Sequence, residues 1–405
     1  MLNPRLDDLM TYPFERLARL LLGIEPPKNM APISMSLGEP QLAPPAFVAA
    51  DMAAAAPDWG RYPPNRGTPG FRGAVADWLK ARYGLPDGFI QGDTNVLPCA
   101  GTREAIFMFA LAVVPPAKIR DGKALRPAVL MPNPLYHVYS GGAVLAGAEP
   151  IYLPARAENR FLPDLRGLRA DLLDRVALAY LCSPANPQGS AATMEDLCSA
   201  IEMAIVHDFV LAVDECYSEI YDRQPPVGAL EAAASFGSRR ELAREHIVVF
   251  NSLSKRSSAP GLRSGFVAGG EKAIAAFAKL RNFASCQTPL PIVTVAEHLW
   301  RDEDHVRATR EAYRARFNLA EQMLEGRYGF YRPDGGFFLW LDVGDGEEAA
   351  KRLWAEAGLR VLPGAYLCPD EPELQAPGTR YIRLALVHDL ETIGEALTRL
   401  RRVLN

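Results

Sequence analysis

The sequence has neither an excess of one charge nor an apolar run suited to a membrane. Its 405 residues include 44 Lys and Arg against 48 Asp and Glu, a formal net charge of −4. This balance excludes the basic surface of nucleic-acid-binding proteins and a polybasic membrane patch. The N-terminus, MLNPRLDDLM, carries acids early, and arginines break the following RLARLLLG, which argues against a signal peptide or a transmembrane segment. We therefore expect a cytoplasmic protein with no nucleic-acid and no membrane partner.

Metal-binding and nucleotide-binding motifs are also missing. The six cysteines form no CxxC pair, which argues against a zinc ribbon or a thioredoxin-like site. The six histidines are scattered, so each is more typical of a structural residue than of a ligand, and we expect no metal. The chain has no G-x-G-x-x-G after a strand, no G-x-x-x-x-G-K-[ST], no G-x-S-x-G and no H-E-x-x-H. Mostly apolar neighbours predict buried free thiols at positions 99, 182, 198, 216, 286 and 368.

Short β-rich runs alternate with helical patterns through the middle of the chain. Many of the runs stop in Pro, Gly or Asn, and a T-x-E-D sequence that begins at Thr193 resembles a helix N-cap. Near-continuously apolar strands that alternate with helices predict a mostly parallel sheet covered on both faces. The β-rich runs occupy residues 126–134, 175–189, 209–217, 246–255 and 262–270. We therefore predict an α/β fold, in which ligands bind at the carboxyl ends of the strands.

The sequence pattern changes after about residue 290. A long charged helical stretch leads into a strand, a helix and two further strands, which predict a smaller α+β domain. The length of 405 residues is enough for two or three domains. We predict an N-terminal arm with part of the small domain at 1–48, a large domain at 49–290 and a small C-terminal domain at 291–405.

Two charged residues follow apolar strands of the predicted sheet. Lys255 ends the sequence SLSK, where hydroxyl groups beside an amine can hold an anion. A desolvated lysine can also form a Schiff base with a carbonyl compound, whereas most lysines after a strand are solvated surface residues. Asp214 closes LAVD, and a buried carboxylate needs a partner. A positively charged ligand atom can be that partner, and a helix cap or a loop ion pair is the alternative.

Four more polar positions have both a structural and a functional explanation. Asn186, between two prolines in SPANPQG, suits a turn and also a rigidly held hydrogen-bond donor. Tyr217 either packs or reaches the same site as Asp214. The glycine and threonine of CAGTREAIF precede a helix, whose first N–H groups are either capped or able to bind phosphate. Arg383 alternates with aliphatic residues in RYIRLALV, so it faces either solvent or a substrate carboxylate in a cleft.

Taken together, these segments resemble the class I/II aminotransferases, a family of fold-type I pyridoxal-phosphate enzymes. Nine segments occur in the family's order along nearly the whole chain: SLGEP, RYPPNRGTPGFR, AGTREAI, PNPLYHVY, SPANPQG, DECY, SLSK, GLRSG and YIRLAL. The resemblance implies a large domain with a mostly parallel seven-stranded sheet between helices, a smaller α+β domain, and pyridoxal 5′-phosphate as the cofactor. It also implies small-molecule amino-acid and 2-oxo-acid substrates and a homodimer with shared active sites.

The resemblance implies catalytic roles for individual residues. Lys255 matches the lysine that holds the cofactor covalently and then moves a proton between the substrate α-carbon and the cofactor. Asp214 matches the partner of the pyridine nitrogen, which keeps the ring an electron sink. Asn186 and Tyr217 match the groups that hydrogen-bond the 3-oxygen of the ring. Arg383 matches the clamp for the substrate α-carboxylate.

Other positions match contacts of the cofactor and the substrate. Tyr136 falls where the family stacks an aromatic ring on the cofactor, and Tyr62 falls where a tyrosine reaches the phosphate of the other subunit. Gly38 and Asn186 match substrate contacts beside the arginine clamp. The remaining predicted cofactor contacts, most of them around the phosphate, are Gly101, Thr102, Arg103, Ser252, Ser254 and Arg263.

Within the family, the opening LNPRLDDLMTYPFERLARLL and the segments RYPPNRGTPGFR and LYHVYSGGAVLAGAEPIYL are most similar to bacterial N-succinyl-diaminopimelate aminotransferases. That similarity implies exchange of an amino group between N-succinyl-L,L-diaminopimelate and 2-oxoglutarate by ping-pong kinetics, in lysine biosynthesis. We expect the segment 39–45 and partner-subunit loops to recognise the distal end of the substrate.

The sequence also departs from the family pattern and leaves alternatives open. Leu135, His137 and Gln188 stand where the family commonly has glycine, proline and threonine. No position matches the partner-subunit arginine that binds the side chain of aspartate, which argues against a simple aspartate enzyme. The alternatives are an aminotransferase for aspartate, acetylornithine or an aromatic amino acid, or a C–S β-lyase on the same fold.

Overall fold

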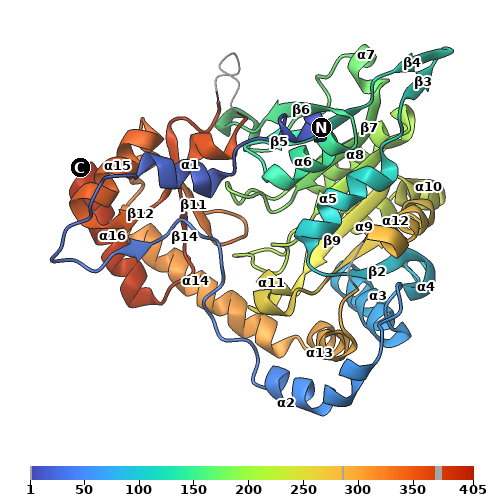
Figure 1. The fold of residues 1–405 in the computed structure, drawn as a ribbon, viewed down its shortest axis with the longest axis horizontal. Coiled ribbons are helices and arrows are strands. Elements are labelled where there is room, and N and C mark those ends of the chain that lie inside the picture. The colour runs from blue at the N-terminus through green and yellow to red at the C-terminus, as the bar shows by residue number, and fades with distance from the viewer. Residues whose placement is uncertain (1, 285–286, 370–375) are drawn as a thin grey trace.

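A computed structural model of the protein describes residues 2–284, 287–369 and 376–405. Figure 1 shows a larger part, built on one sheet, and a smaller part that contains the C-terminus. Cys286, one of the predicted buried thiols, lies outside the described residues. The other five cysteines are unpaired, and all except Cys198 are buried. None of the helices in the described ranges is long and apolar enough to cross a membrane.

The large sheet has seven strands, of which β10 alone is antiparallel to its neighbours. The predicted α/β class and the mostly parallel seven-stranded sheet are therefore confirmed. Their order across the sheet is β2 (Val96–Cys99), β10 (Gly265–Gly269), β9 (Ile247–Ser252), β8 (Val210–Asp214), β7 (Val176–Cys182), β5 (Ala128–Asn133) and β6 (Glu149–Pro154). The register pairs Cys182 with Asp214 and Asp214 with Phe250. The carboxyl ends of β7, β8 and β9 consequently lie side by side.

Helices cover both faces of this sheet because its strands are apolar on both sides. Leu211 and Val213 of β8 pack into the hydrophobic cluster of one face, while Ala212 packs into that of the other. The first face carries α3 (Pro69–Tyr83), α8 (Met194–His207), α9 (Ala229–Ala234), α10 (Arg240–Glu245) and α13 (Leu290–Arg301). The second carries α5 (Thr102–Val113), α6 (His137–Leu145) and α12 (Glu271–Ala284). At α8, Thr193 and Asp196 form a capping box, which confirms the predicted N-cap.

The small part is built on a three-stranded antiparallel sheet in the order β11 (Phe338–Asp342), β14 (Tyr381–Ala385) and β13 (Leu362–Pro363). Its core includes residues of α14 (Asp304–Leu324), α15 (Gly346–Ala357) and α16 (Leu390–Leu404). The N-terminal arm joins it, because β1 (Ile33–Ser34) pairs in parallel with β12 (Leu359–Arg360). Leu17 of α1 (Pro13–Leu20) packs beside Trp340 and Leu362.

The packing of α13 and α14 bears on the boundary between the two parts. Val293 and Trp300 of α13 belong to the hydrophobic cluster that covers the large sheet, and α13 packs on α3. Phe317 and Ala320 of α14, in contrast, belong to the small-part core. We therefore propose that the large domain extends through Arg301, about ten residues beyond the boundary expected from the sequence.

The remaining elements are short, except for α2. Helix α2 (Phe47–Ala54) lies beside α13 (Figure 1), and α11 (Leu253–Arg256) follows β9 directly. The others are α4 (Gly92–Asn95), α7 (Ala170–Leu173) and the hairpin of β3 (Lys118–Arg120) and β4 (Lys123–Leu125). Single 3₁₀ turns occur at Pro4–Leu6, Ala56–Gly60, Ala157–Asn159, Gly237–Arg239, Pro260–Leu262, Arg327–Gly329 and Gly364–Leu367.

Candidate active site

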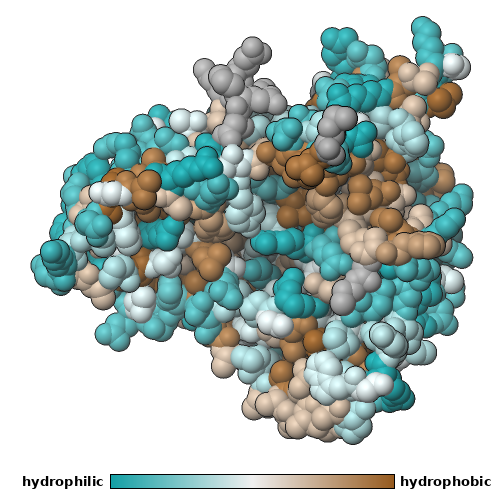
Figure 2. Space-filling view, viewed as in Figure 1, coloured by the Kyte–Doolittle hydropathy of each residue, from teal (hydrophilic) through white to brown (hydrophobic). Residues whose placement is uncertain are grey.

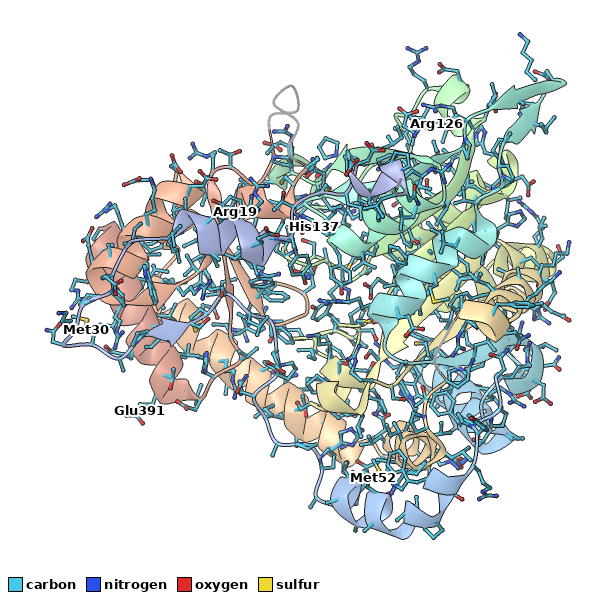
Figure 3. All side chains as sticks on the ribbon, in the orientation of Figure 1. Arg19, Met30, Met52, Arg126, His137 and Glu391 are labelled. Carbon is cyan, nitrogen blue, oxygen red and sulfur yellow. The ribbon has the colours of Figure 1, made fainter. Side chains whose placement is uncertain are left out.

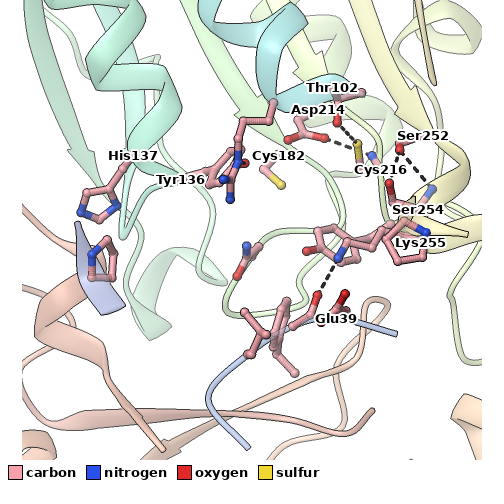
Figure 4. A pocket seen from close by; sticks show the side chains of 18 of the residues that line it. Glu39, Thr102, Tyr136, His137, Cys182, Asp214, Cys216, Ser252, Ser254 and Lys255 are labelled. Atoms are coloured by element: carbon pink, nitrogen blue, oxygen red, sulfur yellow. Dashed lines mark hydrogen bonds between the residues drawn. The ribbon is translucent and has the colours of Figure 1, made fainter. Parts of the chain in front are cut away.

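A cavity of about 720 Å³ lies where β7, β8 and β9 end and faces strands of the small part. Residues far apart in the sequence meet there, from the N-terminal arm, the large sheet and β14 (Figure 4). Twelve of the predicted site residues line it: Gly38, Thr102, Arg103, Tyr136, Asn186, Asp214, Tyr217, Ser252, Ser254, Lys255, Arg263 and Arg383. Gly101 lies against the guanidinium of Arg263, and Tyr62 is not among the residues that line the cavity.

Lys255 projects from α11 into this cavity. Its Nζ donates a hydrogen bond to the Gly38 carbonyl oxygen at 2.6 Å and lies 5.0 Å from the centre of the Phe337 ring. Burial lowers the pKa of the Lys255 amine to about 8; Cys216 opposes that shift and Arg383 adds to it. The amine is therefore neutral, and able to act as a nucleophile or a base, at a much lower pH than an exposed lysine.

Asp214 ends β8 beside the lysine and is only 5% exposed. The backbone N–H of Cys216 donates to its Oδ1 at 3.1 Å, and the Tyr139 hydroxyl donates to its Oδ2 at 3.0 Å. Burial raises the pKa of this carboxyl, while these hydrogen bonds lower it. A buried carboxylate held on both oxygens is suited to a cationic nitrogen in the cavity.

Sequence reasoning missed Tyr139. The residue is 1% exposed, and its ring stacks on Tyr180 with the two centres 4.7 Å apart. It lies three residues after Tyr136, so both rings come from the beginning of α6. The tyrosine pair in LYHVY is the signal that was available, because residues three apart share one face of a helix.

An anion-binding cradle lies at the N-terminus of α5. Gly101 caps the helix with φ of +88°, and a side chain there would collide with the guanidinium of Arg263. The hydroxyl groups of Ser252 and Ser254 are 2.9 Å apart on the same wall of the cavity. The free N–H groups of the helix end, the hydroxyls and the arginine together suit a phosphate group.

Arg383 approaches the same cavity from β14 in the small part. It is 5% exposed, and it donates to the Ser36 carbonyl oxygen at 2.8 Å and to Oδ1 of Asn186 at 3.1 Å. Its guanidinium lies 4.3 Å from the centre of the Phe338 ring, and its Nε has no partner among the described residues. Burial lowers the pKa of Arg383 to about 10, so it remains a cation at neutral pH and can bind a carboxylate.

The N-terminal arm closes one side of the cavity, and the part of it that the sequence did not single out is the segment around Tyr12. Arg103 donates to the Tyr136 hydroxyl at 2.7 Å and to the hydroxyl of Tyr12, in the arm, at 2.9 Å. His137 lies at the edge of the cavity, far from Lys255 in Figure 4 and near α1 in Figure 3. Burial lowers the pKa of His137 to about 4, and its Nε2 has no hydrogen-bond partner among the described residues.

Pyridoxal-phosphate enzymes typically combine a lysine, a buried carboxylate and a helix end suited to a phosphate. In this protein the three lie together at the edge of a parallel sheet that helices cover on both faces. The profile of the family "Aminotransferase class I and II" matches residues 32–400, and this chain belongs to that family. An aminotransferase from Neisseria meningitidis Z2491 has 35% sequence identity and a TM-score of 0.92, with 100% of both chains covered.

Two curated relatives are similar over most of their length. LL-diaminopimelate aminotransferase of Aquifex aeolicus (strain VF5) is 31% identical over 92% of this chain and 91% of the relative. The enzyme of the same name from Dehalococcoides mccartyi (strain ATCC BAA-2266 / KCTC 15142 / 195) is 30% identical over 98% of both chains. The predicted family, the aminotransferase activity and the dependence on pyridoxal phosphate are thereby confirmed.

The residues present fit that cofactor. A side chain at Gly101 would fill the space in front of Arg263, so the glycine keeps the cradle open for a phosphate. Asp214 offers a held carboxylate to a ring nitrogen, and Lys255 offers an amine to an aldehyde, from the same cavity. The individual roles of these residues stay predictions.

Proposed function

We propose that this protein transfers an amino group between a diaminopimelate donor and a 2-oxo acid such as 2-oxoglutarate. The observation that carries the proposal is the buried Arg383, which faces the same cavity as Lys255. An α-carboxylate bound by that guanidinium places the neighbouring α-carbon toward the amine. The names of the two relatives support diaminopimelate as the donor.

Each residue then has a defined task. Arg383 binds the α-carboxylate of the donor and, in the second half-reaction, that of the acceptor. Lys255, with its pKa lowered to about 8, would accept the α-proton as a neutral amine and deliver it to the bound cofactor. Bound pyridoxal phosphate supplies the electron sink that makes this proton acidic. Asp214, held in place by the Tyr139 hydroxyl and the Cys216 N–H, would pair with the ring nitrogen of the cofactor.

Two forms of the donor are compatible with this chemistry. Free LL-diaminopimelate ends in an ammonium and a carboxylate, whereas the N-succinyl form predicted from the sequence has a neutral amide and one more carboxylate. Glu39 and Arg103 both line the cavity, and a cavity that offers an acid as well as a cation matches the free form better. We therefore propose free LL-diaminopimelate as the preferred donor, in agreement with the names of the relatives, and N-succinyl-L,L-diaminopimelate as the alternative.

We also propose a homodimer in which the two subunits share their active sites. Tyr62 is 101% exposed and Trp59 is 56% exposed, and Phe283 presents another large apolar ring to solvent. Figure 2 shows further apolar residues gathered over the region of α5 and α6. Such surfaces are typical of protein–protein contacts.

Sedimentation should show that the protein is a dimer. The Tyr62→Ala variant should retain the cofactor less well but should remain a dimer. A monomer that retains full activity would contradict the shared site. The cytoplasmic location stays a prediction.

The direct test is a titration of cofactor-loaded protein with a donor panel, followed by absorbance. The panel contains LL-diaminopimelate, its N-succinyl form, glutamate, acetylornithine, aspartate and an aromatic amino acid. Conversion to the amino form of the cofactor at the lowest concentration of LL-diaminopimelate would support the proposal. Preference for the N-succinyl form would support the alternative, and preference for another donor would refute both. A separate incubation with cystathionine, which carries sulfur on its β-carbon, tests the lyase: release of pyruvate and ammonia without conversion of the cofactor would indicate a C–S β-lyase.

A further inference from the structure

The helix that carries Lys255 is too short to fix its own orientation. Helix α11 contains only four residues, and a single helical turn is unstable in isolation. At its beginning, the Ser254 N–H donates to the Ser252 hydroxyl, and Leu253 N donates to the Ser264 carbonyl oxygen at 3.1 Å. The position of the Lys255 side chain therefore depends on what holds the other end of the turn.

Two consecutive residues fasten that end to the junction of α13 and α14. Arg256 is 1% exposed and donates to the Leu299 carbonyl oxygen at 2.6 Å and to the Asp302 carbonyl oxygen at 3.3 Å. It also pairs with the Glu303 carboxylate, and its guanidinium lies 4.9 Å from the centre of the Trp300 ring. These contacts anchor the backbone of the turn on the large-domain side.

The second fastening is a chain of three side chains, from Asp302 through His305 to Ser257. Nε2 of His305 lies 2.8 Å from the hydroxyl of Ser257, which is 1% exposed. Nδ1 of His305 contacts the Asp302 carboxylate, and its backbone N–H donates to the same oxygen at 3.1 Å. An ionised carboxylate only accepts, so Nδ1 donates to it, and Nε2 of the neutral ring accepts the proton of the serine. Burial lowers the pKa of His305, which favours this neutral form.

Although a serine, a histidine and an aspartate also occur together in hydrolases, this chain of contacts does not form a hydrolytic site. Ser257 is buried and is not among the described residues that line the active-site cavity. Its hydroxyl contacts His305 of α14. Ser257 follows Lys255 by two residues, and its backbone N–H donates to the Leu253 carbonyl oxygen at 3.0 Å.

We infer that His305 is a positioning residue for Lys255, acting through the hydroxyl of Ser257. His305 lies in the first turn of α14, and the same helix continues into the small part that carries Arg383. Figure 1 shows α11 directly beside this end of α14. The hydrogen bond between His305 and Ser257 therefore connects α11, which carries Lys255, to α14, which leads into the small part that carries Arg383. The inference rests on the role of Lys255 in the proposed function.

The test compares two isosteric replacements of His305. Glutamine can place its amide near the position of Nε2 and keep the bond to Ser257, whereas asparagine reaches only the position of Nδ1. We expect His305→Asn and Ser257→Ala to lower kcat about fivefold, the equivalent of one intramolecular hydrogen bond, with KM for the donor changed less than about twofold. His305→Gln should keep kcat within about twofold of the wild type.

Two further readouts separate positioning from a general loss of stability. The pH midpoint of the absorbance of lysine-bound cofactor should move in His305→Asn and Ser257→Ala but stay unchanged in His305→Gln. The double variant Ser257→Ala/His305→Asn should lose no more activity than either single variant, because both remove the same bond. Equal losses in the asparagine and glutamine variants, or full activity in Ser257→Ala, would overturn the inference. If the wild type itself shows no lysine-bound cofactor, the role of Lys255 fails instead.

Discussion

Lys255 should lose its proton at a far lower pH than an ordinary lysine. Its pKa is lowered from 10.5 to about 8, with burial as the largest cause. At pH 7 a pKa of about 8 leaves roughly 9% of the amine neutral, against about 0.03% for a pKa of 10.5. The structure therefore predicts about 300-fold more reactive amine than a surface lysine would offer.

The assay is the rate at which apoprotein captures pyridoxal phosphate, measured by absorbance over a range of pH. Since only the neutral amine attacks the aldehyde, the rate should rise with pH and level off above about 8. Glu39→Gln removes a charge that raises the pKa of Lys255, so its profile should move to lower pH. Arg383→Gln removes a charge that lowers it, so its profile should move to higher pH. A midpoint near 10.5, or identical profiles in all three proteins, would refute the reasoning.

The remaining predictions concern residues around the lysine. Tyr139→Phe keeps the stacked ring but removes a hydrogen bond to a charged group, which is worth about 1.5–3 kcal/mol. Cofactor dissociation, measured by dialysis, should therefore become about tenfold faster or more. Unchanged cofactor retention would show that Tyr139 does not support Asp214. Burial raises the pKa of Glu215 to about 7, so the folded state holds a proton that the unfolded state releases. Apoprotein stability in denaturant titrations should therefore fall by about 1.4 kcal/mol per unit as pH rises from about 4.5 to 7, and Glu215→Gln should flatten this slope. His137→Phe should change kcat/KM for diaminopimelate about fivefold but leave that for glutamate unaltered, because the ring lines the cavity edge far from Lys255; equal effects on both would contradict a role at the distal end.

Much of the fold follows from local patterns. The apolar strands that end at Asp214 and Ser252, and the capping box at Thr193, depend on neighbouring residues only, and the structure has them where the sequence predicts. The ends of adjacent parallel strands necessarily meet, so Asp214 and Lys255 were expected at one site. Arg383 is different, because its alternation with aliphatic residues is compatible with a position facing solvent and with one facing the cleft. Before the structure, only the family resemblance predicted that Arg383 lies in the site. The packing of β14 then brings it to the cavity.

Other features depend on tertiary contacts that no local pattern specifies. Tyr139 reaches Asp214 only because its helix lies against the end of β8. The domain boundary that we propose lies later than the predicted one because α13, although it follows the change in sequence pattern, packs its apolar face on α3. His305 looked like one more scattered histidine, and its bond to Ser257 joins residues 48 positions apart. These contacts can be identified only in the folded structure.

The central claim is that Lys255 holds the cofactor in this aminotransferase. The most direct test is reduction of the cofactor-loaded protein with borohydride, digestion, and mass spectrometry of the labelled peptide, with Lys255→Ala as the matched control. We expect a single cofactor-modified lysine, at position 255, and a control that binds the cofactor without labelling and turns over no substrate. Label on another lysine, or full activity in Lys255→Ala, would contradict the claim.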